Sequence, residues 1–236
     1  MFTTEHLLTT GLILALVAGL VTAARRSPGT WTIVACRVLA VVIIVNETSW
    51  WVWLAFHGVY RADYALPLQL CDLACFASAA ALWTRRPLLV ELTWFWGLAG
   101  TANGLITPDV ANRFPDFLYL QYFTAHGGIV LAAFLLVIGL RISPRPWSSL
   151  RVFALTCLVL AADALIDLAI NANYLYLRHP PGVHSPLDLL GPWPWYVAGA
   201  AGIALGAFLL LELPFRLGVR PSRPARPEMA RRPGGR

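Results

Sequence analysis

Seven long apolar segments dominate this chain and restrict what it can fold into. A helix needs about 20 mainly apolar residues to cross the hydrocarbon layer of a membrane. Of the 236 residues, 58% are hydrophobic and only 13% are charged. Because the connections are short, neighbouring helices should be antiparallel and packed together. The sequence therefore predicts an all-α polytopic membrane protein, a bundle of seven transmembrane helices at about residues 7–24, 33–56, 68–83, 88–106, 117–140, 150–171 and 195–214.

The arginines predict how this bundle is oriented. All 18 basic residues are arginines. Seven lie in the first, third and fifth connections, and seven more follow the last segment. The opposite connections hold only Arg61, Arg113 and Arg178, and Arg37 lies inside the second segment. Since basic connections stay in the cytoplasm, we expect the N-terminus outside and the C-terminus in the cytoplasm, in a multi-pass protein of the plasma (inner) membrane.

The two ends of the chain are read from their charges. Glu5 precedes the first segment and Arg25 and Arg26 follow it, an order that favours a retained helix over a cleaved signal peptide. Residues 1–215 are expected to form one seven-helix domain. Residues 216–236, rich in Arg, Pro and Gly, are expected to be a disordered basic tail that attracts anionic lipid headgroups. The net charge of +6 therefore indicates membrane orientation and no nucleic-acid partner.

The cysteines and histidines do not predict a cofactor. Cys36, Cys71, Cys75 and Cys157 all lie in apolar segments, with neither a disulfide framework nor zinc-ligand spacing. The five histidines have no ligand spacing to one another, and nucleotide-binding fingerprints are missing from the sequence. We therefore predict no metal and no cofactor.

The stretch 66–73, Leu-Pro-Leu-Gln-Leu-Cys-Asp-Leu, carries the sharpest candidate site. Pro67 favours the start of a helix, and Cys71, about one turn in, feels the positive end of its dipole. His126 is expected at a similar depth, so Cys71 and His126 are candidate catalytic nucleophile and base. Asp72 is about 100° around the helix from Cys71 and should face elsewhere, orienting a histidine or pairing with Arg61. The alternative is that Cys71 is packing and His126 a polar contact between helices.

Asp163, Asp167 and Asn171 follow one another at four-residue spacing, on one helix face. Carboxylates in a membrane segment face the bundle interior. They form either a proton or cation relay, or a structural polar seam. Glu91, near the cytoplasmic end of its segment, is expected to lie at the surface with little functional weight.

Other polar and aromatic residues gather at the predicted outer end of the bundle. Tryptophans there are more typical of an interfacial belt than of a substrate platform. Together with Asp72, Asp163, Asp167 and Asn171, the residues expected to line an outer pocket are Asn46, Glu47, Arg61, Thr107, Asn173, Tyr174, Trp193 and Trp195.

As a set, these motifs resemble the bacterial YwaF-like family of integral membrane proteins. The resemblance covers about residues 46–215, with one departure: Gln69 stands where the family's PLHLCDL-like run has histidine. The motifs that carry it are at 60–61, 67–73, 91 with 95–98, 107–109, 114–115, 126–127, 171–177 and 191–196.

YwaF-like proteins are similar to a eukaryotic transmembrane family that includes an acyltransferase making polyunsaturated ether phospholipids, in which a cysteine and a histidine are implicated. The resemblance implies acyl transfer through a thioester, with Cys71 as nucleophile and His126 as general base. An outward-facing site favours a phospholipid as the acyl donor.

Three functions therefore stand side by side. The first is a lipid acyltransferase or transacylase, with membrane lipids as ligand or substrate. The second is a small proton-coupled transporter that uses Glu47, Asp163 and Asp167; the lack of inverted repeats counts against it. The third is a membrane scaffold or sensor without enzymatic activity.

Overall fold

The computed structural model describes residues 3–108, 110–181 and 186–218 of the chain. Asp109 and His184 lie outside these residues, as does most of the predicted basic tail, at 219–236. The described residues are predominantly helical and contain no strand, which confirms the predicted all-α class. The helices and helical turns are α1 Thr4–Arg26, α2 Thr30–Phe56, α3 Ala62–Ala65, α4 Leu70–Thr84, α5 Pro87–Phe95, η1 Trp96–Thr101, α6 Ala102–Ile106, α7 Phe117–Phe134, η2 Leu135–Gly139, α8 Ser148–Ile170, η3 Tyr174–Tyr176, η4 Pro186–Leu190 and α9 Trp195–Arg216.

Five of the described helical stretches are long and apolar enough to cross a membrane: α1, α2, α7 with η2, α8 and α9. This confirms a multi-pass membrane protein. The predicted segment at 68–83 corresponds to α4, an apolar helix of only 15 residues. The predicted segment at 88–106 corresponds to α5, η1 and α6, which follow one another without a break.

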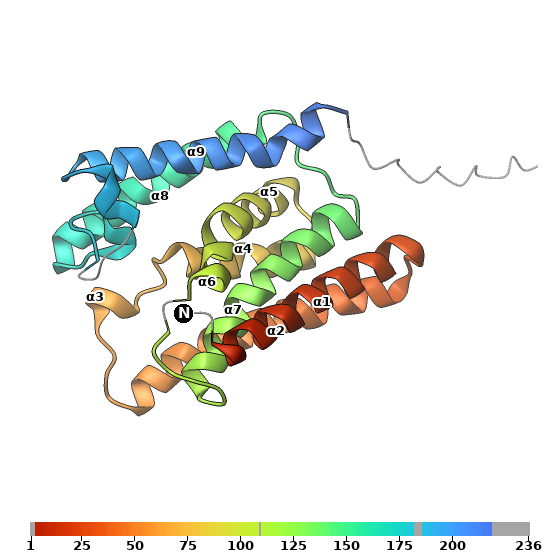
Figure 1. Ribbon diagram of the computed structural model, residues 1–236, viewed down its shortest axis with the longest axis horizontal. Coiled ribbons are helices and arrows are strands. Elements are labelled where there is room, and N and C mark those ends of the chain that lie inside the picture. Colours follow the sequence, from red (N-terminus) through yellow and green to blue (C-terminus); the bar gives the residue numbers. More distant parts are fainter. Residues whose placement is uncertain (1–2, 109, 182–185, 219–236) are drawn as a thin grey trace, which may run out of the picture.

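Helix α4 lies at the centre of the bundle and packs against α2, α5, η1 and α7. One reason is its many small residues, since Ala74, Ala77, Ala79 and Ala81 are all buried and let neighbouring helices approach closely. Figure 1 shows α8 and α9 side by side along one edge, with α4, α5 and α6 between this pair and the group of α1, α2 and α7.

The α8–α9 pair is attached to α5 and η1 by aromatic contacts. The indole of Trp96 donates to the Thr156 hydroxyl at 2.8 Å, and that of Trp94 donates to the Leu211 carbonyl at 3.3 Å. The rings of Phe95 and Phe208 pack with their centroids 5.2 Å apart. The α8–α9 pair is therefore held to the central helices mainly through α5 and η1.

The start of α4 differs from the prediction in one detail. Pro67 does not open the helix, which begins three residues later at Leu70. Instead, Gln69 and Asp72 form a capping box, in which each side chain accepts a hydrogen bond from the backbone N–H of the other residue. Capping, rather than proline, therefore sets where Cys71 enters the helix.

Candidate functional site

A cavity of about 370 Å³ lies between α2, the start of α4 and the first half of α7. It contains four of the residues expected at the site: Glu47, Cys71, Asp72 and His126. None of the described residues that line it is an arginine. The other lining residues are Trp50, Tyr64, Leu66, Gln69, Val110, Ala111, Asn112, Leu118, Gln121, Tyr122 and Ala125.

Asp72 faces the same cavity as Cys71, and the expectation that the two would face apart is wrong. The Cys71 thiol donates to Asp72 Oδ1 at 3.6 Å, and Asp72 Oδ2 accepts from the Gln69 N–H at 3.1 Å. The reason is the capping box, which folds the Asp72 side chain back over the N-terminus of α4. A carboxyl group is therefore the hydrogen-bond partner of the thiol.

The imidazole of His126 is fixed in one tautomer. Its Nδ1 lies 2.8 Å from the carbonyl oxygen of Tyr122. A carbonyl oxygen can only accept, so Nδ1 carries a proton, and in the neutral imidazole Nε2 then keeps its lone pair. The ring also stacks on Tyr122, with centroids 4.0 Å apart. With its free lone pair on Nε2, the neutral ring has the form of a general base.

Cys71 and His126 line one cavity but are not hydrogen-bonded to each other anywhere in the described chain. The thiol is bonded to Asp72, and the ring to the Tyr122 carbonyl. Catalytic hydrogen bonds are often loose without substrate and tighten when it binds. The arrangement therefore places the two reactive groups around a shared space.

Glu47 joins this site from α2. Its side chain is almost fully buried and lies next to the carboxyl of Asp72 and the thiol of Cys75. Two carboxyl groups this close together and away from water repel each other when both are ionised. The cavity thus combines a thiol, an imidazole and two neighbouring carboxyl groups.

Ten of the twelve expected pocket residues do not line this cavity, and three of the ten precede α7 in the sequence. Asn46 donates to the Gln121 carbonyl at 3.0 Å and so links α2 to α7. Thr107 caps α6 through the Asn103 carbonyl, at 3.1 Å. Arg61 is exposed and binds Asp63, with Nε 3.1 Å from Oδ1; this hydrogen bond holds the pKa of the Asp63 carboxyl below its usual value. Arg61 therefore does not pair with Asp72.

Asp163 and Asp167 lie on α8, which packs on α9, α5 and η3, whereas Glu47 lies on α2, which packs on α4 and α7. Both aspartates are buried, and each has one carboxyl oxygen, Oδ2, without a hydrogen-bond partner among the described atoms. The structure therefore separates the three carboxylates that the transporter hypothesis needs together.

The polar residues after α8 shape the loop there and do not line the cavity. Asn171 ends α8 in a left-handed conformation, and its side chain accepts from Arg178 at 2.8 Å. Asn173 accepts from the backbone N–H of Arg178 at 2.9 Å. Trp193 donates to the Leu177 carbonyl at 3.0 Å, and Trp195 is mostly exposed. These are structural or interfacial positions.

Tyr174 connects this loop to the cavity wall. Its hydroxyl donates to the Ala62 carbonyl at 2.7 Å and accepts from the Leu66 N–H at 2.8 Å, while its own N–H donates to Asp167 at 2.9 Å. Burial raises the pKa of the Tyr174 phenol, which keeps the donated proton in place. Tyr174 thus fixes the segment that carries Tyr64 and Leu66.

Sequence reasoning missed several cavity residues, among them Tyr64, Gln69, Asn112, Gln121 and Tyr122. Gln69 and Tyr122 carried a usable signal, because Gln69 lies three residues before Asp72, as in a capping box, and Tyr122 lies one helical turn before His126. Nothing in the sequence indicates that residues 110–112 fold over the same space.

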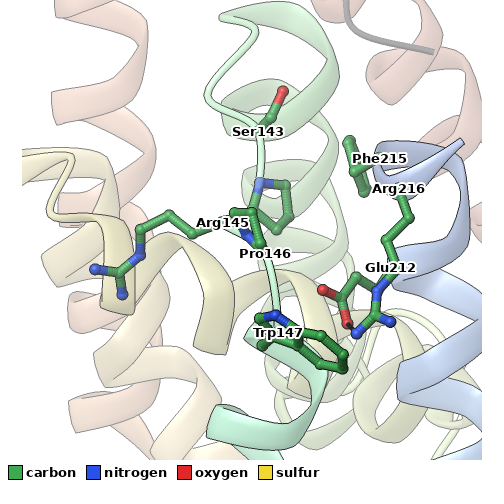
Figure 2. Close-up of a pocket in the computed structure, with 8 residues that line it drawn as sticks. Ser143, Arg145, Pro146, Trp147, Glu212, Phe215 and Arg216 are labelled. Atoms are coloured by element: carbon green, nitrogen blue, oxygen red, sulfur yellow. Dashed lines mark hydrogen bonds and ion pairs between the residues drawn. The ribbon is translucent and has the colours of Figure 1, made fainter. Parts of the chain in front are cut away.

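A second cavity, of about 320 Å³, lies at the opposite end of the bundle, between the α7–α8 loop and the end of α9. Figure 2 shows Glu212 beside Trp147 and Arg216, with the Arg145 side chain extending away from them. Arg216 binds Glu212 at 3.0 Å and lies 4.3 Å from the centroid of the Trp147 ring. These charges are paired within the chain.

Glu91 is buried, contrary to its expected surface position. It is 1% exposed and accepts from the N–H and guanidinium of Arg145, at 3.1, 2.8 and 3.0 Å, and from Arg151 at 2.8 Å. Burial without these partners would be costly. The prediction placed Glu91 at the surface because it lies close in sequence to the end of its apolar segment. The α7–α8 loop, which is distant in sequence, folds over this residue and buries it.

No group of three or more His, Cys, Asp or Glu side chains in the described parts of the chain is arranged to hold a metal ion.

Comparison with known proteins gives a family and one relative. The model of the TMEM164 family matches residues 1–212. An uncharacterized protein of Treponema pallidum (strain Nichols) is 30% identical over 155 residues, which make up 64% of this chain and 62% of that protein. The match thus spans less than two thirds of that relative. No solved structure matches the chain.

Proposed function

This chain belongs to the TMEM164 family, and we propose that it is a lipid acyltransferase that carries an acyl group as a thioester on Cys71. The observation that carries the proposal is that Cys71 and His126, from different helices, line one cavity. The resemblance to YwaF-like proteins, and through them to an ether-phospholipid acyltransferase family, supports the same reaction.

The first half of the reaction acylates the thiol. His126 Nε2 accepts the Cys71 proton while the sulfur attacks the ester carbonyl carbon of a phospholipid. The carbon–oxygen bond to the glycerol then breaks, and the leaving oxygen takes the proton from His126. The products are the Cys71 thioester and a lysophospholipid. Because Nδ1 is already committed to the Tyr122 carbonyl, Nε2 is the nitrogen that moves the proton.

The second half transfers the acyl group. The hydroxyl of an acceptor lysolipid gives its proton to His126 and attacks the thioester carbonyl. The carbon–sulfur bond breaks, and the thiolate recovers the proton from His126. Water in place of the acceptor would give hydrolysis, so exclusion of water from the cavity favours transfer.

The start of α4 supplies hydrogen-bond donors for the oxyanion. The N–H groups of Leu70 and Cys71 belong to the first turn of the helix, and within the described residues neither has an acceptor. Amides at a helix N-terminus stabilise negative charge, and donors aimed at a developing oxyanion are a major source of catalysis.

We further propose seven membrane crossings, with the N-terminus outside and residues 216–236 as a basic cytoplasmic tail on a single domain of residues 1–215. The described residues form seven helical stretches at the predicted positions, with α5, η1 and α6 counted as one stretch and α7 with η2 as another. These seven stretches support the count. Helix α4 is the short one: its 15 residues span about 22 Å of a roughly 30 Å layer. In this orientation, in the plasma (inner) membrane, the Cys71 cavity opens toward lipids of the outer leaflet.

A transfer assay in proteoliposomes tests the proposal. Purified protein is given a phospholipid with a labelled acyl chain and an unlabelled lysophospholipid acceptor. We expect labelled product from the wild-type protein and none from Cys71→Ser. The change His126→Gln should lower the rate by about 10²–10⁴-fold, the usual contribution of a general base.

Cys75→Ser is the matched control, since Cys75 lies one turn further along the same helix and is buried. It should retain transfer. Equal rates for the wild-type protein and Cys71→Ser would refute the mechanism.

A further inference from the structure

A third cavity, of about 160 Å³, lies between the α8–α9 pair, η3 and the first turn of α4. Its walls are formed mainly by hydrocarbon side chains, most of them half-buried. Leu70 faces it from α4, Leu160 from α8, Leu175 from η3, and Val197, Ala201 and Ala204 from α9.

The buried hydroxyl groups in this wall already form hydrogen bonds within the protein and are not available to a polar ligand. Thr156 accepts from the Trp96 indole at 2.8 Å and donates to the Val152 carbonyl at 2.8 Å. Tyr196 donates to the Tyr176 carbonyl at 2.5 Å. The remaining hydroxyl belongs to Tyr176, whose side chain is exposed. Apolar cavities of this size stay dry and accept apolar guests.

The backbone at this cavity is held in an unusual conformation. Leu175 and Tyr176 are consecutive non-glycine residues with φ of 54° and 55°, in the left-handed region. Such residues persist where the surrounding structure enforces them, and they gather at ligand sites. Here they place Leu175 against the cavity.

Leu70, which faces this cavity, directly precedes Cys71, which faces the cavity of the candidate site. Neighbouring helical residues point about 100° apart, so the two spaces lie against adjacent faces of the first turn of α4. In a bilayer, the apolar guest at hand is a lipid hydrocarbon chain. We propose that the cavity walled by Leu70, Leu160, Leu175, Val197, Ala201 and Ala204 binds the acyl chain of the lipid that reacts at Cys71.

This inference rests on the proposed function for the identity of the reacting lipid, but chain binding has a readout of its own. The small side chains of Ala201 and Ala204 leave the space on the α9 side. Filling it should displace the chain and limit the length of acyl group that Cys71 accepts.

The experiment uses the full chain in proteoliposomes containing a phospholipid with a diazirine on its acyl chain. After irradiation, cross-linked residues are identified by mass spectrometry. We expect cross-links at Leu160 and Val197 in the wild-type protein, and at least a fivefold loss of them in Ala201→Phe. Ala204→Leu adds a smaller side chain and should cause a partial loss of these cross-links. It replaces Ala201→Phe in the experiment if that variant does not fold.

Ile203→Phe is the matched control, because Ile203 lies on the same helix with 62% of its surface exposed, and it should leave the cross-links unchanged. Cross-links found only at exposed lipid-facing residues, or unaffected by both alanine variants, would overturn the inference. Cavity cross-links without any thioester on Cys71 would overturn the proposed function and leave chain binding standing.

Acyl chains of different lengths provide the second readout. In Ala201→Phe, the longest chain that forms a thioester on Cys71 should be shorter than in the wild-type protein, with short chains unaffected. An unchanged length profile would show that the chain lies elsewhere.

Discussion

Gly104 lies where any side chain would collide with His126. A Cβ at this position would be 2.3 Å from Cδ2 and 2.7 Å from Nε2 of the imidazole, and 2.8 Å from the Tyr122 hydroxyl. A small displacement of a catalytic group costs about 10²-fold in rate. Gly104 is therefore a positioning residue for His126.

Gly104→Ala should lower the transfer rate at least tenfold. The reason is that the His126 ring packs between Tyr122 and Gly104. A methyl group added at residue 104 would force the ring to move. The rate and the thermal unfolding midpoint are measured together. Gly206→Ala, where a Cβ meets nothing within 4 Å, is the control, and a Gly104→Ala enzyme with wild-type rate would refute the positioning role.

Single residues also show what the sequence could reveal about the site. Cys71 and His126 were identifiable because reactive side chains in apolar segments are few. The orientation of Asp72 was not, because helical spacing ignores a side chain that folds back to cap its own helix. Glu91 was misjudged for a similar reason, since the loop that buries it comes 54 residues later.

At the level of helices, the continuous stretch of α5, η1 and α6 changes its helical twist part of the way along. The π-helical turn η1, Trp96–Thr101, inserts an irregularity into an otherwise α-helical stretch. Such turns often lie at functional sites. Within this turn, Gly100 packs against Leu70, and beyond it, in α6, Gly104 packs against His126. The stretch from α5 to α6 thereby contacts α4, which carries Cys71, and α7, which carries His126.

Five of the seven predicted apolar segments are confirmed as helices long and apolar enough to cross a membrane. They were predictable to within a few residues of their ends, because length and composition alone identify them. The π-helical turn was not, since no local pattern distinguishes it from a regular helix; tertiary packing decides it.

Glu91→Gln should destabilise the attachment of the α7–α8 loop to α5. It weakens three charge-assisted hydrogen bonds from Arg145 and Arg151, each partner more than a third exposed. Since released arginines regain water, we expect a loss of about 2 kcal/mol, seen as a lower thermal unfolding midpoint in detergent.

Asp63→Asn is the comparison, because Asp63 pairs with Arg61 at the surface, where ion pairs contribute little. If both variants lost the same stability, burial of Glu91 would not matter to the fold.

At the scale of the whole molecule, the packing of the helices decides which buried carboxyl groups lie near one another. The sequence alone could not decide this. Glu47 joins Asp72 at the Cys71 cavity, whereas Asp163 and Asp167 lie on α8. Hydropathy identifies helices but not their neighbours, so a three-carboxylate relay was conceivable from sequence. The same limitation hid the two further cavities.

The distribution of arginines predicts the topology of the bundle. With fourteen on one side and three on the other, residues introduced near Ser27 or Arg86 should be protected from a membrane-impermeant thiol reagent in intact cells. A residue introduced at Val59 should be labelled. The measurement uses cysteine-free protein carrying one new cysteine at a time, and the reverse labelling pattern would contradict the orientation.

The most direct test of the account is the mass of the intact protein after incubation with phospholipid vesicles and acid quenching. We predict one added acyl group on the wild-type protein and on Cys75→Ser, removed by neutral hydroxylamine, and none on Cys71→Ser. An acyl adduct that persists in Cys71→Ser, or a wild-type protein that never gains one, would contradict a thioester mechanism at Cys71.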